Sequence, residues 1–268
     1  MSILKLENVS FKYNENLQAL NDVSFSVEKG EFLCILGHNG SGKSTLSKLI
    51  MGLEKATSGE IVIDGVNLNE ETVEDLRHKL GIVFQNPDNQ FVGITVKDDI
   101  AFGLENRNID RLVMLERINY YANLVGISHL LNRNPESLSG GEKQKVAIAS
   151  ILALEPEIII FDESTSMLDP KSVKELLETI KSLKGNKTII YITHNLDEAL
   201  LADKVIVMKE GQMILSGTVM DVFKETKLLN SAGLETFDVL KLVKLIDERK
   251  LNKGKEVKEL LWQLTYQK

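Results

Sequence analysis

The sequence EFLCILGHNGSGKS, residues Glu31–Ser44, joins an apolar run to a glycine-rich turn that ends in a lysine and a serine. The apolar run Glu31–Leu36 is typical of a buried strand in a parallel sheet. The glycines permit a tight backbone path that turns several N–H groups toward one point. Apolar residues at helical spacing then predict a helix over Thr45–Met51 that ends at Gly52. This order of strand, loop and helix predicts a site for a phosphate chain.

The turn matches the pattern G-x-x-x-x-G-K-[ST], which arises by chance in about one chain in a hundred of this length. A glycine-rich turn with a solvated lysine is the alternative, and the flanking strand and helix disfavour it. The Lys43 ammonium is expected to reach the β- and γ-phosphates of a nucleotide, and Ser44 to ligate Mg²⁺. The candidate nucleotide-binding residues here are Gly37, His38, Asn39, Gly40, Ser41, Gly42, Lys43, Ser44 and Thr45.

A second candidate anion-binding element, Leu138–Glu142 (LSGGE), lies about a hundred residues further along the chain. Ser139 and Glu142 have the spacing of a capping box that opens a helix, predicted over Lys143–Leu154. Beside a phosphate loop, the segment has a second interpretation. The paired glycines Gly140 and Gly141 would let this backbone approach a γ-phosphate held by another subunit, which predicts a nucleotide sandwiched between two such domains.

Two carboxylates follow the apolar run Ile158–Phe161, at the end of a strand where parallel sheets bind ligands. Asp162 is the expected partner of Mg²⁺, through water, and Glu163 is the candidate general base for an attacking water. Another buried strand, Lys187–Thr193, ends at His194, which is placed to donate to the γ-phosphate.

Together these motifs resemble the ATPase subunits of ABC transporters, over about residues 3–217. The resemblance implies ATP and Mg²⁺ as cofactors, and it makes Glu163 the catalytic glutamate and His194 the switch histidine. It also implies that Gln85 joins the Mg²⁺ site to a transmembrane partner and that Tyr13 stacks on adenine. Ser164 departs from the pattern, because many relatives have proline there.

The stretches Gln85–Phe91 (QNPDNQF) and Thr95–Gly103 (TVKDDIAFG) resemble a narrower group, the ATP-binding A components of energy-coupling factor (ECF) transporters. With DESTSMLD at Asp162–Asp169, the chain is similar to the first of their two paralogous ATPases. The resemblance implies an importer of vitamins or other micronutrients, energised from the cytoplasmic face of the membrane. Its implied partners are a second ATPase (a paralogue or another copy), a transmembrane coupling subunit and a substrate-binding membrane subunit. A dedicated cobalt or nickel importer is the alternative.

Composition agrees with a peripheral subunit. The 268 residues contain no apolar stretch near the ~20 needed to span a bilayer. Cys34 is the only cysteine, so no intrachain disulfide can form. The formal charge of −7 disfavours nonspecific binding of nucleic acid. The remaining alternative is a soluble ABC ATPase that acts on DNA or ribosomes, and it is disfavoured because the sequence has neither a second copy of the motif set nor a long coiled coil.

The expected fold class is α/β: a phosphate-loop ATPase with a mainly parallel sheet, an antiparallel β-subdomain and a helical subdomain. The ATPase domain is expected over residues 1–217, with the helical subdomain at about 86–150, where Leu112, Leu115, Ile118, Tyr121 and Leu124 form an apolar stripe. A helical extension is expected over residues 218–268. Its two apolar stripes are equally compatible with a dimer contact and with packing on its own domain; they are Leu240, Val243 and Ile246, and Val257, Leu260, Leu261 and Leu264.

Acidic side chains near Gln85 predict a docking surface. Asp88, Asp98, Asp99 and Glu105 face only Lys97 in this stretch. As a group they would form an acidic groove that pairs with arginines on the coupling helices of a membrane subunit.

Overall fold

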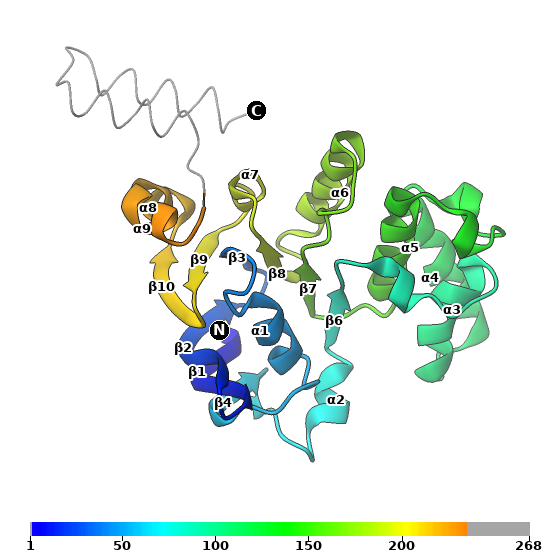
Figure 1. Ribbon diagram of the computed structural model, residues 1–268. Helices are drawn as coiled ribbons and strands as arrows, with labels where there is room; N and C mark the ends of the chain where they lie inside the picture. The colour runs from blue at the N-terminus through cyan, green and yellow to red at the C-terminus, as the bar shows by residue number, and fades with distance from the viewer. Residues whose placement is uncertain (1, 235–268) are drawn as a thin grey trace, which may run out of the picture.

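The structure, a computed structural model, describes residues 2–234 without the side chain of residue 89 (Figure 1). Its centre is a six-stranded sheet in the order β10-β9-β3-β8-β7-β6. Neighbouring strands run parallel except β9 and β10, which are antiparallel. The strands are β3 (Phe32–Leu36), β6 (Leu80–Val83), β7 (Ile158–Asp162), β8 (Thr188–Thr193), β9 (Lys204–Lys209) and β10 (Gln212–Gly217). The mainly parallel α/β core predicted from the sequence is confirmed.

Every residue of β3, β6, β7 and β8 is buried. Alternate side chains of β3 enter two different cores: Phe32, Cys34 and Leu36 face one cluster, and Leu33 and Ile35 face the other. The sheet is therefore covered on both sides, which explains why its strands read as unbroken apolar runs. Burial also raises the pKa of the Cys34 thiol, so this cysteine is a core residue and a poor nucleophile.

A smaller antiparallel sheet contains the N-terminal strands and has the order β2-β1-β4-β5. Its strands are β1 (Ser2–Asn14), β2 (Leu17–Glu28), β4 (Ser58–Ile63) and β5 (Val66–Asn67). The turn between β4 and β5 is Asp64-Gly65, and both residues have positive φ, 50° and 77°. That geometry suits the twist of a tight hairpin, so the predicted antiparallel β-subdomain is confirmed.

The helices are α1 (Lys43–Ile50), α2 (Val73–Arg77), α3 (Val96–Asn106), α4 (Arg111–Leu124), α5 (Gly140–Ala153), α6 (Pro170–Leu183), α7 (Leu196–Ala199), α8 (Val219–Lys224) and α9 (Thr226–Ser231). Two of them begin earlier than predicted, because α1 starts at Lys43 and α5 at Gly140. The first turns of both helices therefore contain the residues of the predicted phosphate-binding segments.

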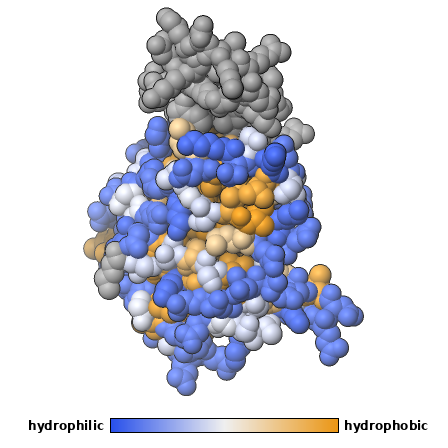
Figure 2. All heavy atoms as spheres, turned by 90° about the vertical axis from the view of Figure 1, so that its left-hand side faces the viewer, coloured by the Kyte–Doolittle hydropathy of each residue, from blue (hydrophilic) through white to orange (hydrophobic). Residues whose placement is uncertain are grey.

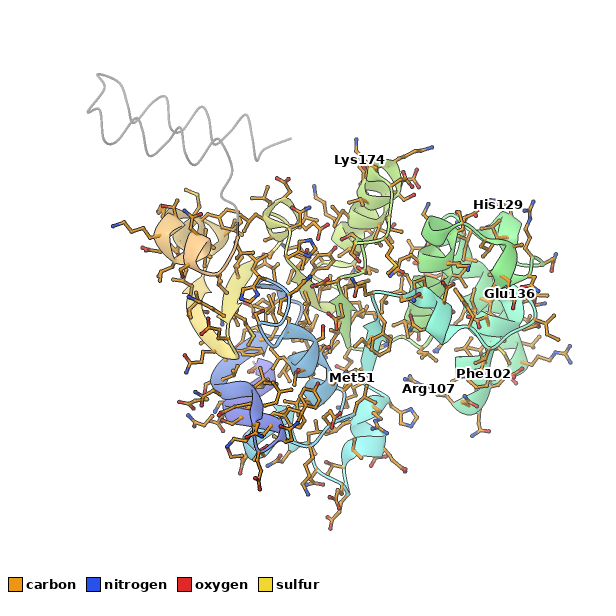
Figure 3. All side chains as sticks on the ribbon, viewed as in Figure 1. Met51, Phe102, Arg107, His129, Glu136 and Lys174 are labelled. Carbon is orange, nitrogen blue, oxygen red and sulfur yellow. The ribbon has the colours of Figure 1, made fainter. Side chains whose placement is uncertain are left out.

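A bundle of α3, α4 and α5 stands beyond the β6 edge of the sheet (Figure 1). Arg107, the residue after α3, donates to the carbonyl of Leu154, the residue after α5, at 2.9 Å. Figure 3 labels Arg107 and also Phe102, which lies on α3. The helical pattern predicted from Leu112 to Leu124 is confirmed by α4, but not all of its apolar residues are buried. Ile118 and Tyr121 are buried, but Leu112 is 77% exposed and Leu124 is also exposed.

The far side of the molecule ends at β10, an edge strand, followed by α8 and α9. Viewed from that side, the surface has an apolar area among polar side chains (Figure 2). Met213, Ile214 and Leu215 of β10 are only half-buried. The predicted C-terminal stripes, from Leu240 to Leu264, lie outside the described residues. Within residues 2–234, no helix is both long and apolar enough to cross a membrane.

Candidate functional site

The loop between β3 and α1 leaves the first turn of α1 open. Gly42 is the N-cap residue with φ 101°, and no side chain caps this helix end. No acidic residue lies in the first turn. The free N–H groups and the positive end of the helix dipole therefore point to a place where an anion is stabilised. The residues of this loop fit a phosphate group.

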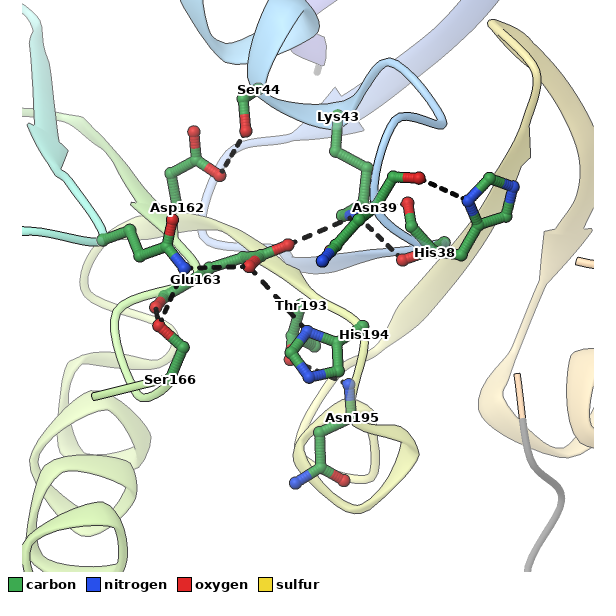
Figure 4. Close-up of polar contacts among 12 residues, drawn as sticks. His38, Asn39, Lys43, Ser44, Asp162, Glu163, Ser166, Thr193, His194 and Asn195 are labelled. Carbon is green, nitrogen blue, oxygen red and sulfur yellow. Dashed lines mark hydrogen bonds and ion pairs between the residues drawn. The ribbon is translucent and has the colours of Figure 1, made fainter. Parts of the chain in front are cut away.

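The Lys43 ammonium lies at the centre of this loop. Its side chain is 3% exposed, and Nζ donates to the carbonyls of Gly37 (2.8 Å) and His38 (3.0 Å). Nζ is also 3.3 Å from Oε1 of Glu163, which joins the loop to the end of β7 (Figure 4). A cation held in this way supplies a fixed positive charge at the mouth of the loop.

Asp162 closes the other side of the loop from the last position of β7. Its Oδ1 accepts from the Ser44 hydroxyl (3.2 Å) and its Oδ2 from the Ser47 hydroxyl (2.9 Å). Burial raises the pKa of this carboxyl, and the two serine hydrogen bonds act in the opposite direction. Sequence reasoning missed Ser47; its position three residues after Ser44, on the same helix face, could have indicated it.

Glu163 follows in a left-handed backbone conformation, φ 50°. Such a conformation costs about 1–3 kcal/mol for a residue other than glycine and is found at functional sites. The Glu163 carboxylate is contacted by Gln85 Nε2 at 3.4 Å and by His194 Nδ1 at 3.8 Å. Gln85 also donates to the hydroxyl of Ser166 (3.1 Å), another residue that the sequence did not single out. Together with Lys43, these contacts bring three segments that are far apart in sequence to the Glu163 carboxylate (Figure 4).

Tyr13 is one of the residues that line an open pocket of about 640 Å³. Its hydroxyl is 3.2 Å from the Thr45 hydroxyl, and its ring is exposed. The lining consists of Tyr13, Leu17, Gln18, Ala19, Asn39, Gly40, Gly42, Lys43, Ser44, Thr45, Gln85, Glu163, Glu210 and Gly211. The volume and the mixture of one aromatic ring with a phosphate loop fit a nucleotide.

Three predicted loop residues do not line that pocket. Gly37 and His38 instead present their carbonyls to Lys43. Ser41 is fully buried, and its backbone carbonyl accepts from the Gly211 N–H at 3.1 Å. The backbone carbonyls of these three residues hold Lys43 and the loop in place without lining the pocket.

Ser139, Gly140 and Gly141 also lie outside the pocket lining, at the start of α5. Ser139 Oγ accepts from the Glu142 N–H, and the Glu142 carboxylate accepts from the Ser139 N–H at 2.9 Å, so the predicted capping box is present. A Cβ on Gly141 would come within 2.8 Å of Ser172 Oγ, whereas one on Gly140 would meet only the Met167 carbonyl at 3.8 Å. Gly140 is therefore the glycine of the pair with more space around its Cβ position.

A second pocket, of about 360 Å³, adjoins Ser44 and Asp162 and is also lined by Gln85. Residues 2–234 contain no cluster of three or more His, Cys, Asp or Glu side chains that could hold a metal. A magnesium ion would fit here because it binds oxygen ligands. Hydroxyl, amide and phosphate oxygens can serve as its ligands together with one carboxylate. The predicted set Ser44, Gln85 and Asp162 has that chemistry.

The acidic groove expected after Gln85 stays a prediction: Asp88, Asp98 and Glu105 are exposed, but most of these carboxylates also have local partners. Asp88 forms an ion pair with Lys143 at 2.6 Å. Asp98 completes a capping box with Thr95. Asp99 is buried and accepts from the N–H groups of residues 92 and 93. These contacts help to hold the loop in place. The same stretch also has three exposed apolar side chains: Val92 (63%), Ile94 (80%) and Phe102 (48%).

Comparison with known proteins agrees with this site. The profile of the ABC transporter family matches residues 20–166. The energy-coupling factor transporter ATP-binding protein EcfA1 of Mycoplasma mobile is 53% identical over 251 residues, which cover 91% of this chain and 92% of that protein. The solved structure of cbiO1 from Clostridium perfringens, described as part of the ABC transporter complex cbiONQ, is 35% identical with a TM-score of 0.79, and the match covers 91% of this chain and 99% of that one. A bacterial ABC transporter cassette solved as a dimer, MJ0796, is 30% identical with a TM-score of 0.73 and covers 81% of this chain and 98% of its own.

Proposed function

This chain belongs to the ABC transporter ATPase family and, within it, to the energy-coupling factor ATP-binding proteins, and from this premise we propose that it binds and hydrolyses ATP to energise an importer of vitamins or other micronutrients. One observation carries the proposal. Lys43, Asp162 and Glu163 meet at the open N-terminus of α1, in a pocket of nucleotide size.

The chemistry follows from the position of each side chain. The N–H groups of α1 and the Lys43 ammonium hold the β- and γ-phosphates, while Tyr13 stacks on the adenine. Glu163 takes the proton of the attacking water or orients that water, and His194 donates to the γ-phosphate. Lys43 binds both the ground state and the transition state, whereas Glu163 acts on the transition state.

Magnesium, bound through Ser44, Gln85 and Asp162, would offset the charge of the phosphates. Ser47 supports this arrangement, because its hydroxyl fixes the Asp162 oxygen that does not face Ser44. Gln85 reaches both the candidate metal site and Glu163, so it is placed to transmit a change in the loop after β6 to the reacting groups.

The site is completed by a second ATPase. Ser139, Gly140 and Gly141 lie apart from this chain's own pocket, and they serve the nucleotide held by the partner's phosphate loop. The similar cassette solved as a dimer supports such an arrangement. We propose a paralogous ATPase as the partner, with a second copy of this chain as the alternative.

Membrane subunits dock beside Gln85 at the cytoplasmic face of the membrane. The exposed apolar side chains of Val92, Ile94 and Phe102 follow Gln85 in sequence. The buried Asp99 accepts from the N–H of Val92 and so holds the loop before α3, while Phe102 lies on α3 itself. A coupling helix packed on these side chains would move with the Gln85 loop when the two ATPases close. We propose this contact beside the acidic pairing that the sequence predicts.

Purification of the tagged chain from detergent-solubilised membranes tests the proposal. We expect a second ABC ATPase, a coupling membrane protein and a substrate-binding membrane protein in fixed ratio, with ATPase activity that Lys43→Ala removes. Recovery with ribosomes or DNA in place of membrane proteins would contradict it.

The resemblance in the sequence leaves a second candidate, an ATPase of a cobalt or nickel importer. Uptake by vesicles that contain the purified complex separates the two. ATP-dependent uptake of Co²⁺ or Ni²⁺, without uptake of vitamins, would favour the metal importer.

A further inference from the structure

Glu198 is a buried carboxylate to which the chemistry above gives no role. It lies on α7, four residues after His194, and is 3% exposed. Among the described residues, no basic side chain pairs with it. Its Oε1 accepts from the Thr165 hydroxyl at 2.7 Å, and its Oε2 from the Thr193 hydroxyl at 2.6 Å. A buried carboxylate is costly unless it is hydrogen-bonded, so both threonine contacts matter.

The contact through Thr193 controls the turn that carries His194. Thr193 is the last residue of β8, and its hydroxyl oxygen also accepts from the Asn195 N–H at 3.0 Å. One hydroxyl therefore connects the residues on both sides of His194 and ties them to Glu198. This fixes the direction in which His194 leaves the strand.

The contact through Thr165 controls the loop that carries Glu163. Thr165 lies two residues after Glu163, and its hydroxyl is the one that donates to Oε1 of Glu198. Glu163 itself has a left-handed backbone and donates its N–H to the Ile192 carbonyl at 2.9 Å. An unfavourable backbone conformation persists only when its surroundings hold it. Thr165 and Ile192 supply that restraint from the two sides of Glu163.

We propose that Glu198 is a positioning residue for ATP hydrolysis: it locks the Thr165 loop and the Thr193–Asn195 turn together, so that Glu163 and His194 face one point. The inference rests on the proposed function, because Glu163 and His194 have their roles only if this chain hydrolyses ATP. Glu198 then affects the rate of hydrolysis and takes no part in nucleotide binding, since neither Thr165 nor Thr193 lines the nucleotide pocket.

Threonine variants in the assembled complex test this inference. Thr193→Val keeps the shape of the side chain and removes the hydroxyl. We expect kcat to fall by about tenfold or more, since a small misplacement of reacting groups can cost up to about 100-fold. The KM for ATP should stay unchanged, and Thr193→Ser should restore kcat. Thr165→Val should act in the same way and give an independent result if one variant does not fold.

Thr188→Val is the matched control. Thr188 is buried at the opposite end of β8, where its hydroxyl accepts from the Gly30 N–H at 3.0 Å. Thr188→Val should lower the free energy of unfolding by about as much as Thr193→Val does and leave kcat unchanged. Because Thr165 and Thr193 act through one carboxylate, the double Val variant should lose less than the product of the two single losses.

Equal loss of kcat in Thr193→Val and Thr188→Val, or an effect on KM alone, would overturn the role of Glu198. That result leaves the proposed function intact if Glu163→Gln still abolishes hydrolysis. A wild-type complex that does not hydrolyse ATP would instead contradict the proposed function.

Discussion

The two helix N-termini that the sequence marks as anion-binding, those of α1 and α5, are built differently. The start of α1 has a glycine at the N-cap, no capping side chain and no acidic residue in its first turn. The start of α5 has a serine cap, a reciprocal capping box and Glu142 in its first turn. The α1 end is open toward a pocket of its own chain, and the α5 end is satisfied without a ligand. This difference supports the proposal that α1 holds this chain's nucleotide and that α5 offers a rigid surface to a nucleotide held by a partner.

The largest effect is expected at Glu163, beside the open α1 end. Glu163→Gln should keep ATP affinity and lower turnover by about 10²–10⁴-fold, because general-base catalysis contributes on that scale. Hydrolysis and ATP binding are measured in complexes whose other site is also disabled. Hydrolysis at the wild-type rate in that background would show that another group is the base.

A smaller effect is expected at Asp162, which touches the same helix through Ser44 and Ser47. Asp162→Asn keeps the size of the side chain and removes its charge. The Mg²⁺ concentration that half-activates hydrolysis should rise by about 10- to 100-fold, the usual effect of changing a group that orients a metal through its bound water. A titration with Mg²⁺ at saturating ATP measures this concentration. An unchanged midpoint would contradict the assignment of Asp162 to the metal site.

The smallest effect is expected at the α5 cap. Ser139→Ala should destabilise the isolated chain by about 1 kcal/mol, the usual cost of a lost N-cap. Thr218→Ala removes the similar cap of α8 and should cost about the same while leaving hydrolysis unchanged. Thermal unfolding of both variants gives the comparison, and a Ser139→Ala chain as stable as wild type would mean that the box contributes nothing.

The same cap has a pH dependence. The backbone N–H and the hydroxyl of Ser139 both donate to the Glu142 carboxylate, and they hold its pKa below the usual range. The stabilisation is therefore present above the pKa of the unfolded state, about 4.3, and is lost as the pH falls through the lower folded value. The stability difference between wild type and Ser139→Ala should shrink on acidification, and a difference that grows would contradict the assignment.

Much of the fold could be predicted because its signals are local. Buried parallel strands such as β3 and β7 appear in the sequence as unbroken apolar runs. Because the carboxyl ends of parallel strands lie at one edge of the sheet, Lys43 could be predicted to lie near Asp162 and Glu163. Contacts between distant segments gave no such signal. Nothing local connects Glu198 with Thr165, and the apolar pattern of α4 did not reveal that Leu112 is exposed.

The acidic residues after Gln85 show a second limit. In the sequence they form a charge excess, but their partners are backbone N–H groups, a capping hydroxyl and Lys143, most of them invisible to a count of charges. A local count of charges therefore does not reveal which of these carboxylates also hold the loop, and the exposed apolar side chains carry the proposed contact.

The difference between the two helix ends is tested most directly by the ATP affinity of the isolated chain in two variants. Lys43→Ala at the α1 end should weaken ATP binding by about 10- to 100-fold, since a hydrogen bond to a charged group contributes about 1.5–3 kcal/mol. Gly140→Leu at the α5 end adds a side chain at the glycine of the pair with more space around its Cβ position. It should leave this affinity unchanged and reduce hydrolysis only in the assembled complex. Equal loss of affinity in the two isolated variants would contradict the account, because it would place both helix ends at one nucleotide within a single chain.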